Sequence, residues 1–315
     1  MPRRRIGFAY RFAAVICKPP LVVLLKRDWR GMENIPAEGG FITAVNHNSH
    51  IDPFAYAHFQ YNTGRVPRFL AKSGLFNKGF VGAMMRGTGQ IPVYRESTDA
   101  LSAFRAAIDA VERGECVAFY PEGTLTRDPD GWPMTGKTGA ARVALQTRCP
   151  VVPVAQWGAN EVLPPYAGRP RLFPRKTHRV LAGPPVDLDR FYGREMTPEL
   201  LKEATEVIMA AITRHLEEIR GEKAPAVPYD PQRERVEQRR KTRAQARTRR
   251  KGYGGRSVRG PAEHGPSERR QSAHGAPADG AQAGPQYQEG RHQERQNEQR
   301  RAGKRATARE EGLNT

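Results

Sequence analysis

His47 and Asp52 are the residues of this chain best suited to acid–base chemistry. They stand five positions apart in Asn46-His47-Asn48-Ser49-His50-Ile51-Asp52, directly after the apolar run 41–45. A rigid strand followed by a polar turn is where catalytic side chains are commonly held. A carboxylate beside an imidazole selects one tautomer and stabilises the protonated form, so the histidine can act as a general base near neutral pH.

Two other interpretations of this turn are compatible with its residues. His47, His50 and Asp52 could bind a metal ion, but no further cluster of ligand-type residues follows at a matching spacing, so this interpretation ranks last. Asp52 could also cap a helix that begins with Pro53. The spacing of these residues alone does not decide between a general base, a metal site and a helix cap.

A second polar turn, Tyr120-Pro121-Glu122-Gly123-Thr124, follows the apolar run 116–120. Because glycine lets a ligand approach the backbone, the turn is typical of a binding or catalytic loop. Its composition equally fits an ordinary Pro-Glu-Gly connection.

Two further segments contain features that are found at ligand-binding sites. Arg95 follows the run 90–94, and a guanidinium is a natural bidentate ligand for phosphate, although a lone arginine is commonly a solvated charge. The run 149–154 is apolar but contains Pro150 and Pro153, which favours an edge strand or a wall that faces a ligand.

The elements that must position these residues alternate between short apolar runs and helical periodicities. The runs predict strands at 41–45, 66–71, 90–94, 116–120, 151–156 and 179–182. Helices are predicted at 98–113, 139–147 and from Thr197-Pro198 to a stop at Gly221. The alternation predicts an α/β fold with a mixed, largely parallel sheet flanked by helices.

The net charge of +19 lies mostly at the two ends of the chain. Residues 222–315 hold 22 basic and 12 acidic residues with very few aliphatic ones, and we expect this basic tail to be disordered. Residues 233–251 carry ten basic and two acidic residues, enough for nonspecific contact with nucleic acid or anionic lipid. Few aromatic residues accompany them, so nucleic acid is not the expected partner.

The first 30 residues hold eight basic residues and one acidic residue. Their apolar pieces, 12–17 and 21–25, are separated by Lys18-Pro19-Pro20 and are too short to span a bilayer or to form a secretory signal. The segment 1–30 fits either a basic amphipathic membrane-associating segment or a first core helix with a solvated face. Three cysteines without metal-type spacing indicate a reducing compartment.

Together, four of these segments resemble the motifs of the glycerolipid acyltransferase family, in particular the 1-acylglycerol-3-phosphate acyltransferases. Residues 46–52 resemble the N-H-x4-D block, 89–95 the second block, 120–126 the F-P-E-G-T-R-S block and 151–154 the fourth. The resemblance covers about residues 25–220, and four motifs in order are far more specific than one.

The resemblance implies an acyltransferase domain at 31–221 with a glycerol-3-phosphate acyltransferase-like fold. It implies His47 and Asp52 as the catalytic pair. It implies substrate-binding roles for a further set: Arg95, Glu122, Gly123, Thr124, Lys72 and Lys137. The motif departs from the family at Leu125, where an arginine is usual, and at Gly74, where a glutamate is common. The resemblance implies that the third block binds the phosphate of the acceptor. Because Leu125 replaces the arginine of that block, the identity of the acceptor stays open.

The implied reaction moves a fatty acyl group to the free hydroxyl of 1-acylglycerol 3-phosphate, giving phosphatidic acid, with other lysolipids or glycerol 3-phosphate as alternative acceptors. No metal or cofactor is expected, since acyl-CoA or acyl carrier protein is the co-substrate. Membrane lipids are the expected partners, and the expected location is the cytoplasmic face of the cell membrane, as a peripheral protein. A binding protein that acts through its basic tail is the alternative from another class.

Overall fold

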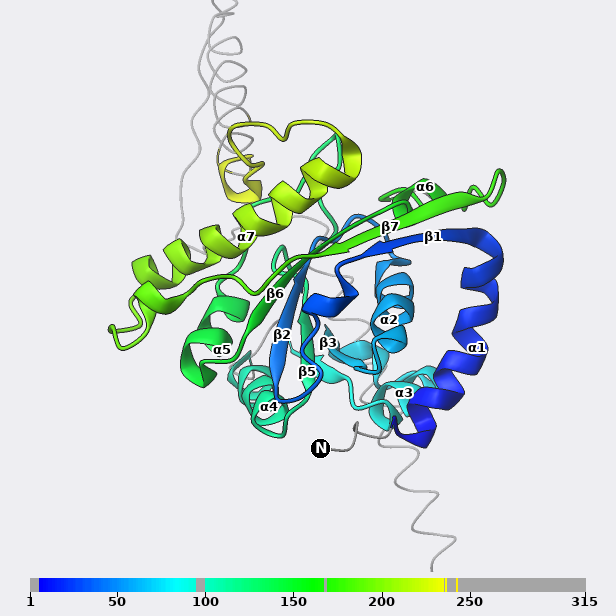
Figure 1. Cartoon of the computed structure of the whole chain (residues 1–315), viewed down its shortest axis with the longest axis horizontal. Helices are drawn as coiled ribbons and strands as arrows, with labels where there is room; N and C mark the ends of the chain where they lie inside the picture. Colours follow the sequence, from blue (N-terminus) through cyan, green and yellow to red (C-terminus); the bar gives the residue numbers. More distant parts are fainter. Residues whose placement is uncertain (1–5, 95–99, 167–168, 235, 237–241, 243–315) are drawn as a thin grey trace, which may run out of the picture. The chain divides into compact units, whose positions relative to one another are not determined.

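The fold is built on a mixed, largely parallel sheet, as predicted, and the sheet has seven strands rather than the six indicated by the apolar runs. The computed structural model describes residues 6–94, 100–166 and 169–234, together with Val236 and Thr242. The strands lie in the order β1-β7-β6-β2-β5-β3-β4, and the β6–β7 pair is antiparallel (Figure 1). Their bounds are β1 Leu25–Arg30, β2 Phe41–Val45, β3 Pro67–Lys72, β4 Ile91–Val93, β5 Cys116–Phe119, β6 Val151–Trp157 and β7 Lys176–Ala182.

Helices cover both faces of the sheet. They are α1 Phe8–Leu24, α2 Asp52–Asn62, α3 Gly79–Gly87, α4 Ala100–Glu112, α5 Gly139–Thr147, α6 Ala159–Val162 and α7 Pro198–Arg220, with short 3₁₀ turns at Met32–Asn34, Ser73–Leu75 and Asp189–Phe191. Helices α4, α5 and α7 pack on one face, and α1, α2 and α3 lie on the other (Figure 1).

The central strands divide their side chains between two cores. In β2, Ile42 and Ala44 pack toward α4, α5 and α7, while Phe41 and Val45 pack toward α2. This alternation follows from the two-residue period of a strand, and burial on both faces explains why the run 41–45 is apolar throughout. The buried strands β2, β5 and β6 therefore give the site a rigid base.

Residues 25–30, placed by the prediction in the N-terminal segment, form strand β1 of the sheet. β1 pairs in parallel with β7 and forms an edge of the sheet. The prediction missed this strand because most of its residues are charged and exposed, as is common at a sheet edge.

Helix α1 runs through Pro19 and Pro20, although the sequence predicted a break there. A proline inside a helix removes one N–H, and here the two missing donors would have bonded to the carbonyls of Val15 and Ile16, whose side chains are exposed. Tyr10 attaches the helix to the domain, since its hydroxyl donates to the carbonyl of Pro67 and its ring stacks on Tyr61. Within the described residues, no helix combines the length and the apolar character needed to cross a bilayer.

Helix α7 begins and ends as predicted, with the Thr197 side chain accepting from the Leu200 N–H and Gly221 in the left-handed region at φ +68°. Beyond it, residues 222–234 pack on the domain, so the first part of the predicted disordered tail is ordered. Except for Val236 and Thr242, the rest of that predicted tail lies outside the described residues.

Candidate active site

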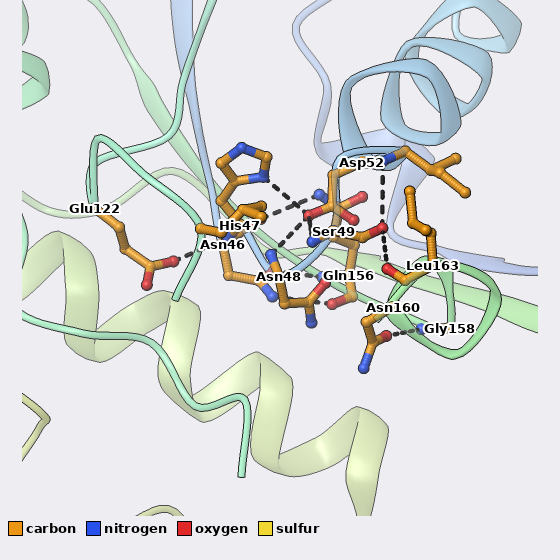
Figure 2. A network of polar contacts seen from close by, with 12 residues as sticks. Asn46, His47, Asn48, Ser49, Asp52, Glu122, Gln156, Gly158, Asn160 and Leu163 are labelled. Carbon is orange, nitrogen blue, oxygen red and sulfur yellow. Dashed lines mark hydrogen bonds and ion pairs between the residues drawn. The ribbon is translucent and has the colours of Figure 1, made fainter. Parts of the chain in front are cut away.

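The turn between β2 and α2 brings His47 and Asp52 together (Figure 2). His47 Nδ1 lies 3.0 Å from Asp52 Oδ2. Asp52 is fully buried, whereas 16 % of the His47 side chain is exposed. When Nδ1–H donates to the carboxylate, Nε2 keeps its lone pair and can accept a proton. This is the geometry of a histidine base with a carboxylate partner.

The same carboxylate oxygen also holds the turn. Asp52 Oδ2 accepts from the backbone N–H groups of Asn48 and Ser49, each at 2.7 Å. Helix α2 has Ile51 rather than Asp52 at its N-cap, so Asp52 stabilises the preceding turn and not the helix end that the sequence suggested. His50 points into solvent. Over the described part of the chain, no group of three or more His, Cys, Asp or Glu side chains gathers as metal ligands.

The loop after β5 fixes the backbone of His47 from both sides. The His47 N–H donates to Glu122 Oε1 at 2.9 Å, and the His47 carbonyl accepts from the Thr126 N–H at 2.7 Å. These contacts join the first and third sequence motifs through the main chain. The position of His47 therefore depends on the conformation of residues 122–126.

Glu122 is a buried connector between two loops. Its Oε2 accepts from the Met134 N–H at 3.0 Å, and its side chain is almost fully enclosed. Burial raises the pKa of Glu122 to about 8, although its backbone donors, Met134 and His47, act in the opposite direction. Both carboxyl oxygens face backbone N–H groups, so Glu122 links His47 to Met134 in this structure.

Tyr120 supports the imidazole ring and was not predicted as a site residue. The rings of His47 and Tyr120 stack at 4.2 Å between centroids, and Tyr120 stacks in turn on Phe69 at 5.9 Å. Burial raises the pKa of the Tyr120 hydroxyl well above its usual range, so this ring stays neutral. The stack restricts rotation of His47. The sequence signal for it is an aromatic residue at the strand end before Pro-Glu-Gly.

Gly123 and Lys137 meet at the turn after β5. Gly123 has φ +70°, which favours glycine, and a Cβ at this position would lie 2.7 Å from Lys137 Nζ. The Lys137 N–H donates to the carbonyl of Pro121 at 2.8 Å, while its side chain is exposed. The Lys137 ammonium group thus lies against Gly123, and the next residue, Thr124, is half-buried.

The remaining predicted residues have different positions. Lys72 is exposed at the end of β3, beside β5 in the sheet. Arg95 lies outside the described residues. Leu125, where the family motif has an arginine, is 4 % exposed and its side chain belongs to the interior. Position 125 therefore offers no charge to a ligand.

A chain of buried polar side chains ends beside His47. Trp29 Nε1–H donates to His178 Nδ1 at 3.3 Å, and His178 Nε2 lies 3.3 Å from Gln156 Oε1. Gln156 and Asn46 bond through both side chain and main chain, at 2.7 to 3.1 Å. Because Trp29 donates to Nδ1, the proton of His178 is on Nε2 and points to Gln156. This chain crosses β1, β7, β6 and the end of β2, and it holds Asn46 in place.

His178 gives the fold a distinct pH dependence. Burial lowers its pKa from 6.5 to about 3, with nearby His58 acting in the same direction. The unfolded chain binds this proton below pH 6.5 and the native chain does not, so stability is lost as the pH falls from 6.5 toward 3. We expect the unfolding free energy to drop by about 2 kcal/mol more in the native chain than in His178→Gln between pH 7 and 5, at roughly 1.4 kcal/mol per pH unit. Denaturant unfolding at the two pH values measures this, and identical pH dependence would contradict it.

Residues 26–157 match the family model described as Acyltransferase. The chain is 29 % identical to 1-acyl-sn-glycerol-3-phosphate acyltransferase of Bacillus subtilis over 157 residues, which cover 49 % of this chain and 70 % of that protein. It is 27 % identical to the chloroplastic 1-acyl-sn-glycerol-3-phosphate acyltransferase BAT2 of Brassica napus over 164 residues, covering 51 % of this chain and 46 % of the relative. The chain thus spans about half the length of the plant protein.

Among solved structures, the chain is similar to the 1-acyl-sn-glycerophosphate acyltransferase PlsC from Thermotoga maritima. The TM-score is 0.51 and the sequence identity is 25 %, over 71 % of this chain and 86 % of that one. The matched residues 26–157 include both the β2–α2 turn and the loop after β5.

Proposed function

Because residues 26–157 match the acyltransferase family model, we propose that this chain transfers a fatty acyl group to the free hydroxyl of 1-acylglycerol 3-phosphate, giving phosphatidic acid. The donor is a thioester, acyl-CoA or acyl carrier protein. The observation that carries the proposal is the contact of 3.0 Å between His47 Nδ1 and Asp52 Oδ2, at the end of a buried strand. The names of the relatives support the acceptor class.

The chemistry follows from the free nitrogen of His47. Nε2 takes the proton of the acceptor hydroxyl as its oxygen attacks the thioester carbonyl carbon, and a positioned histidine base contributes about 10²–10⁴-fold. Asp52 stabilises the imidazolium that forms. When the tetrahedral intermediate collapses, the C–S bond breaks, and the imidazolium supplies the proton that the leaving thiolate needs. The substrate's own hydroxyl is the nucleophile, so no covalent enzyme intermediate is required.

The head of the acceptor is assigned to the turn at Gly123. Lys137 Nζ over this turn supplies a positive charge, and Leu125 supplies none. In this proposal Lys137, with Lys72 and Arg95, takes the place of the arginine usual at position 125. The buried Leu125 favours a second candidate as well: the same transfer to another lysolipid or to glycerol 3-phosphate.

An acceptor panel with the purified full chain tests the proposal. The acceptors are 1-acylglycerol 3-phosphate, glycerol 3-phosphate and amino-lipid lysoforms, each with acyl-CoA and with acyl carrier protein thioester. Preferential formation of phosphatidic acid supports the proposal. Preferential acylation of another acceptor supports the second candidate. Failure to acylate any acceptor from either donor would count against the transferase activity itself.

We further propose that the protein binds the cytoplasmic face of the cell membrane peripherally, through α1 and α3. Large apolar side chains of both helices are exposed: Phe8, Phe12, Val15, Ile16, Val22, Val23, Phe80 and Val81. The rings of Phe12 and Phe80 meet at 6.5 Å between centroids, which makes the two helices one surface. Arg11, Lys26 and Lys78 are exposed on or beside these helices and favour an anionic lipid surface.

Membrane binding is expected to weaken when this surface is made polar. Each phenylalanine contributes roughly 1.5–3 kcal/mol when fully buried in an apolar phase. We expect Phe8→Ser/Phe12→Ser/Phe80→Ser to lower the affinity for vesicles containing phosphatidylglycerol at least about tenfold, measured by co-sedimentation. Met196→Ser, beside α7 on the opposite face, is the control and should bind like the native chain. Unchanged binding of the triple variant would remove α1 and α3 from this role.

A further inference from the structure

Residues 222–234, called the strap below, contact the loop that carries the acceptor-side residues. The Thr135 N–H donates to the carbonyl of Tyr229 at 3.0 Å. Ala224 packs against the cluster around Trp132, and its N–H donates to Glu217 Oε1 at 2.9 Å. The strap lies beyond both the region that matches the family model and the last helix of the domain.

Arg220, the last residue of α7, holds the same loop from a second direction. Its guanidinium carbon lies 4.0 Å from the Trp132 ring centroid and 4.4 Å from that of Trp157. Its Nη1 donates to the carbonyl of Asp130 at 2.8 Å. Its Nη2 lies 2.5 Å from Glu222 Oε2 in the strap. Arg220 therefore links the loop, the helix end and the strap.

This loop, residues 127–137, leads directly to the candidate site. Its Met134 N–H donates to Glu122, and its Lys137 Nζ lies against Gly123. Gly136 packs against α7, since a Cβ there would lie 2.8 Å from Met209 Cγ. A displacement of the loop would therefore change the position of the ammonium group over the Gly123 turn.

We propose that Arg220 and the strap are positioning elements of the acceptor site: they hold loop 127–137 where Lys137 can contact the head of the acceptor. The inference rests on the proposed function, in which Lys137 binds the acceptor. His47 also contacts Asp52 and Tyr120, which lie outside loop 127–137, so loss of the strap contacts affects acceptor binding more than the chemical step.

Two variants of the full chain test the inference by their kinetics. Arg220→Met keeps an apolar side chain between the two indole rings and removes the guanidinium. Its control is Arg214→Met on the exposed side of α7. The second variant replaces residues 224–234 with glycine and serine, and its control is the same replacement of residues 271–281. We expect the KM for the acceptor to rise about tenfold in both variants, while kcat and the KM for the donor change less than about threefold. The controls should match the native chain.

Hydrogen exchange at Met134 and Thr135 provides a readout that does not depend on activity. We expect both amides to exchange at least about tenfold faster in the variants than in the controls. An unmodified chain without transferase activity would overturn the proposed function and leave the strap contact to be judged by exchange. An active chain whose acceptor KM is the same in every folded variant would overturn the strap inference alone, as would unchanged exchange. If the replacement of 224–234 prevents folding, Arg220→Met decides.

Discussion

Replacing His47 with alanine is expected to reduce kcat for acyl transfer by at least about 10²–10⁴-fold, the usual contribution of a positioned histidine base. The acceptor hydroxyl is a poor nucleophile at neutral pH until a base removes its proton, and Nε2 of His47 is the nitrogen available for that purpose. The measurement is transfer from acyl-CoA to 1-acylglycerol 3-phosphate by the purified variant, at saturating concentrations of both substrates.

The variant should fold, because the contacts that fix this residue belong to its main chain. The N–H bond to Glu122 and the carbonyl bond from Thr126 remain when the imidazole is removed. The matched control is His50→Ala in the same turn, where the exposed side chain should tolerate replacement with full activity. Substantial turnover by folded His47→Ala, or equal losses in both variants, would remove His47 from the role of base.

The central part of this site could be predicted from the sequence because its key interaction is local. His47 and Asp52 are five residues apart on one turn, and an apolar run followed by a polar turn indicates where a buried strand ends. The strands β2, β5 and β6 could be predicted for the same reason, since burial on both faces makes them continuously apolar.

The supporting contacts could not be predicted, because they join residues far apart in the chain. Glu122 and Thr126 bond to His47 across more than 70 residues, and Gln156 bonds to Asn46 across 110. Nothing in the local sequence shows that the Glu122 carboxylate faces two backbone N–H groups rather than a ligand. A carboxylate in a Gly-containing turn suggests binding, and only the fold reveals that it is enclosed.

The ends of the domain were predicted wrongly for a related reason. Charge and short apolar pieces suggested separate terminal segments, yet β1 is held by parallel pairing with β7. Backbone N–H and carbonyl groups also hold the strap, at Thr135–Tyr229 and Ala224–Glu217, beside the packing of Ala224 and the Arg220–Glu222 ion pair. Main-chain bonds depend little on side-chain type, so composition does not predict them.

Replacing Asp52 with asparagine is expected to separate the charge of the carboxylate from its hydrogen bonds. All three donors, His47 Nδ1 and the N–H groups of Asn48 and Ser49, converge on Oδ2. Oδ1 is buried and has no hydrogen-bond partner among the described residues. An asparagine whose carbonyl oxygen occupies the Oδ2 position would therefore keep every bond, the tautomer of His47 and the turn.

What the asparagine lacks is the negative charge that stabilises the imidazolium. Two unit charges 4 Å apart interact by about 4 kcal/mol at an effective dielectric constant of about 20, so kcat should fall by up to about 10³-fold, with the acceptor KM nearly unchanged. The amide NH2 at the buried Oδ1 position lacks an acceptor among the described residues, so the thermal midpoint should fall, but by less than in Asp52→Ala. Asp52→Ala is the comparison. It leaves two buried N–H groups without an acceptor, at about 1–3 kcal/mol each, so it should lose stability as well as activity. If Asp52→Asn retained full activity, Asp52 would serve only to hold the turn, and His47 would act without an ionic partner.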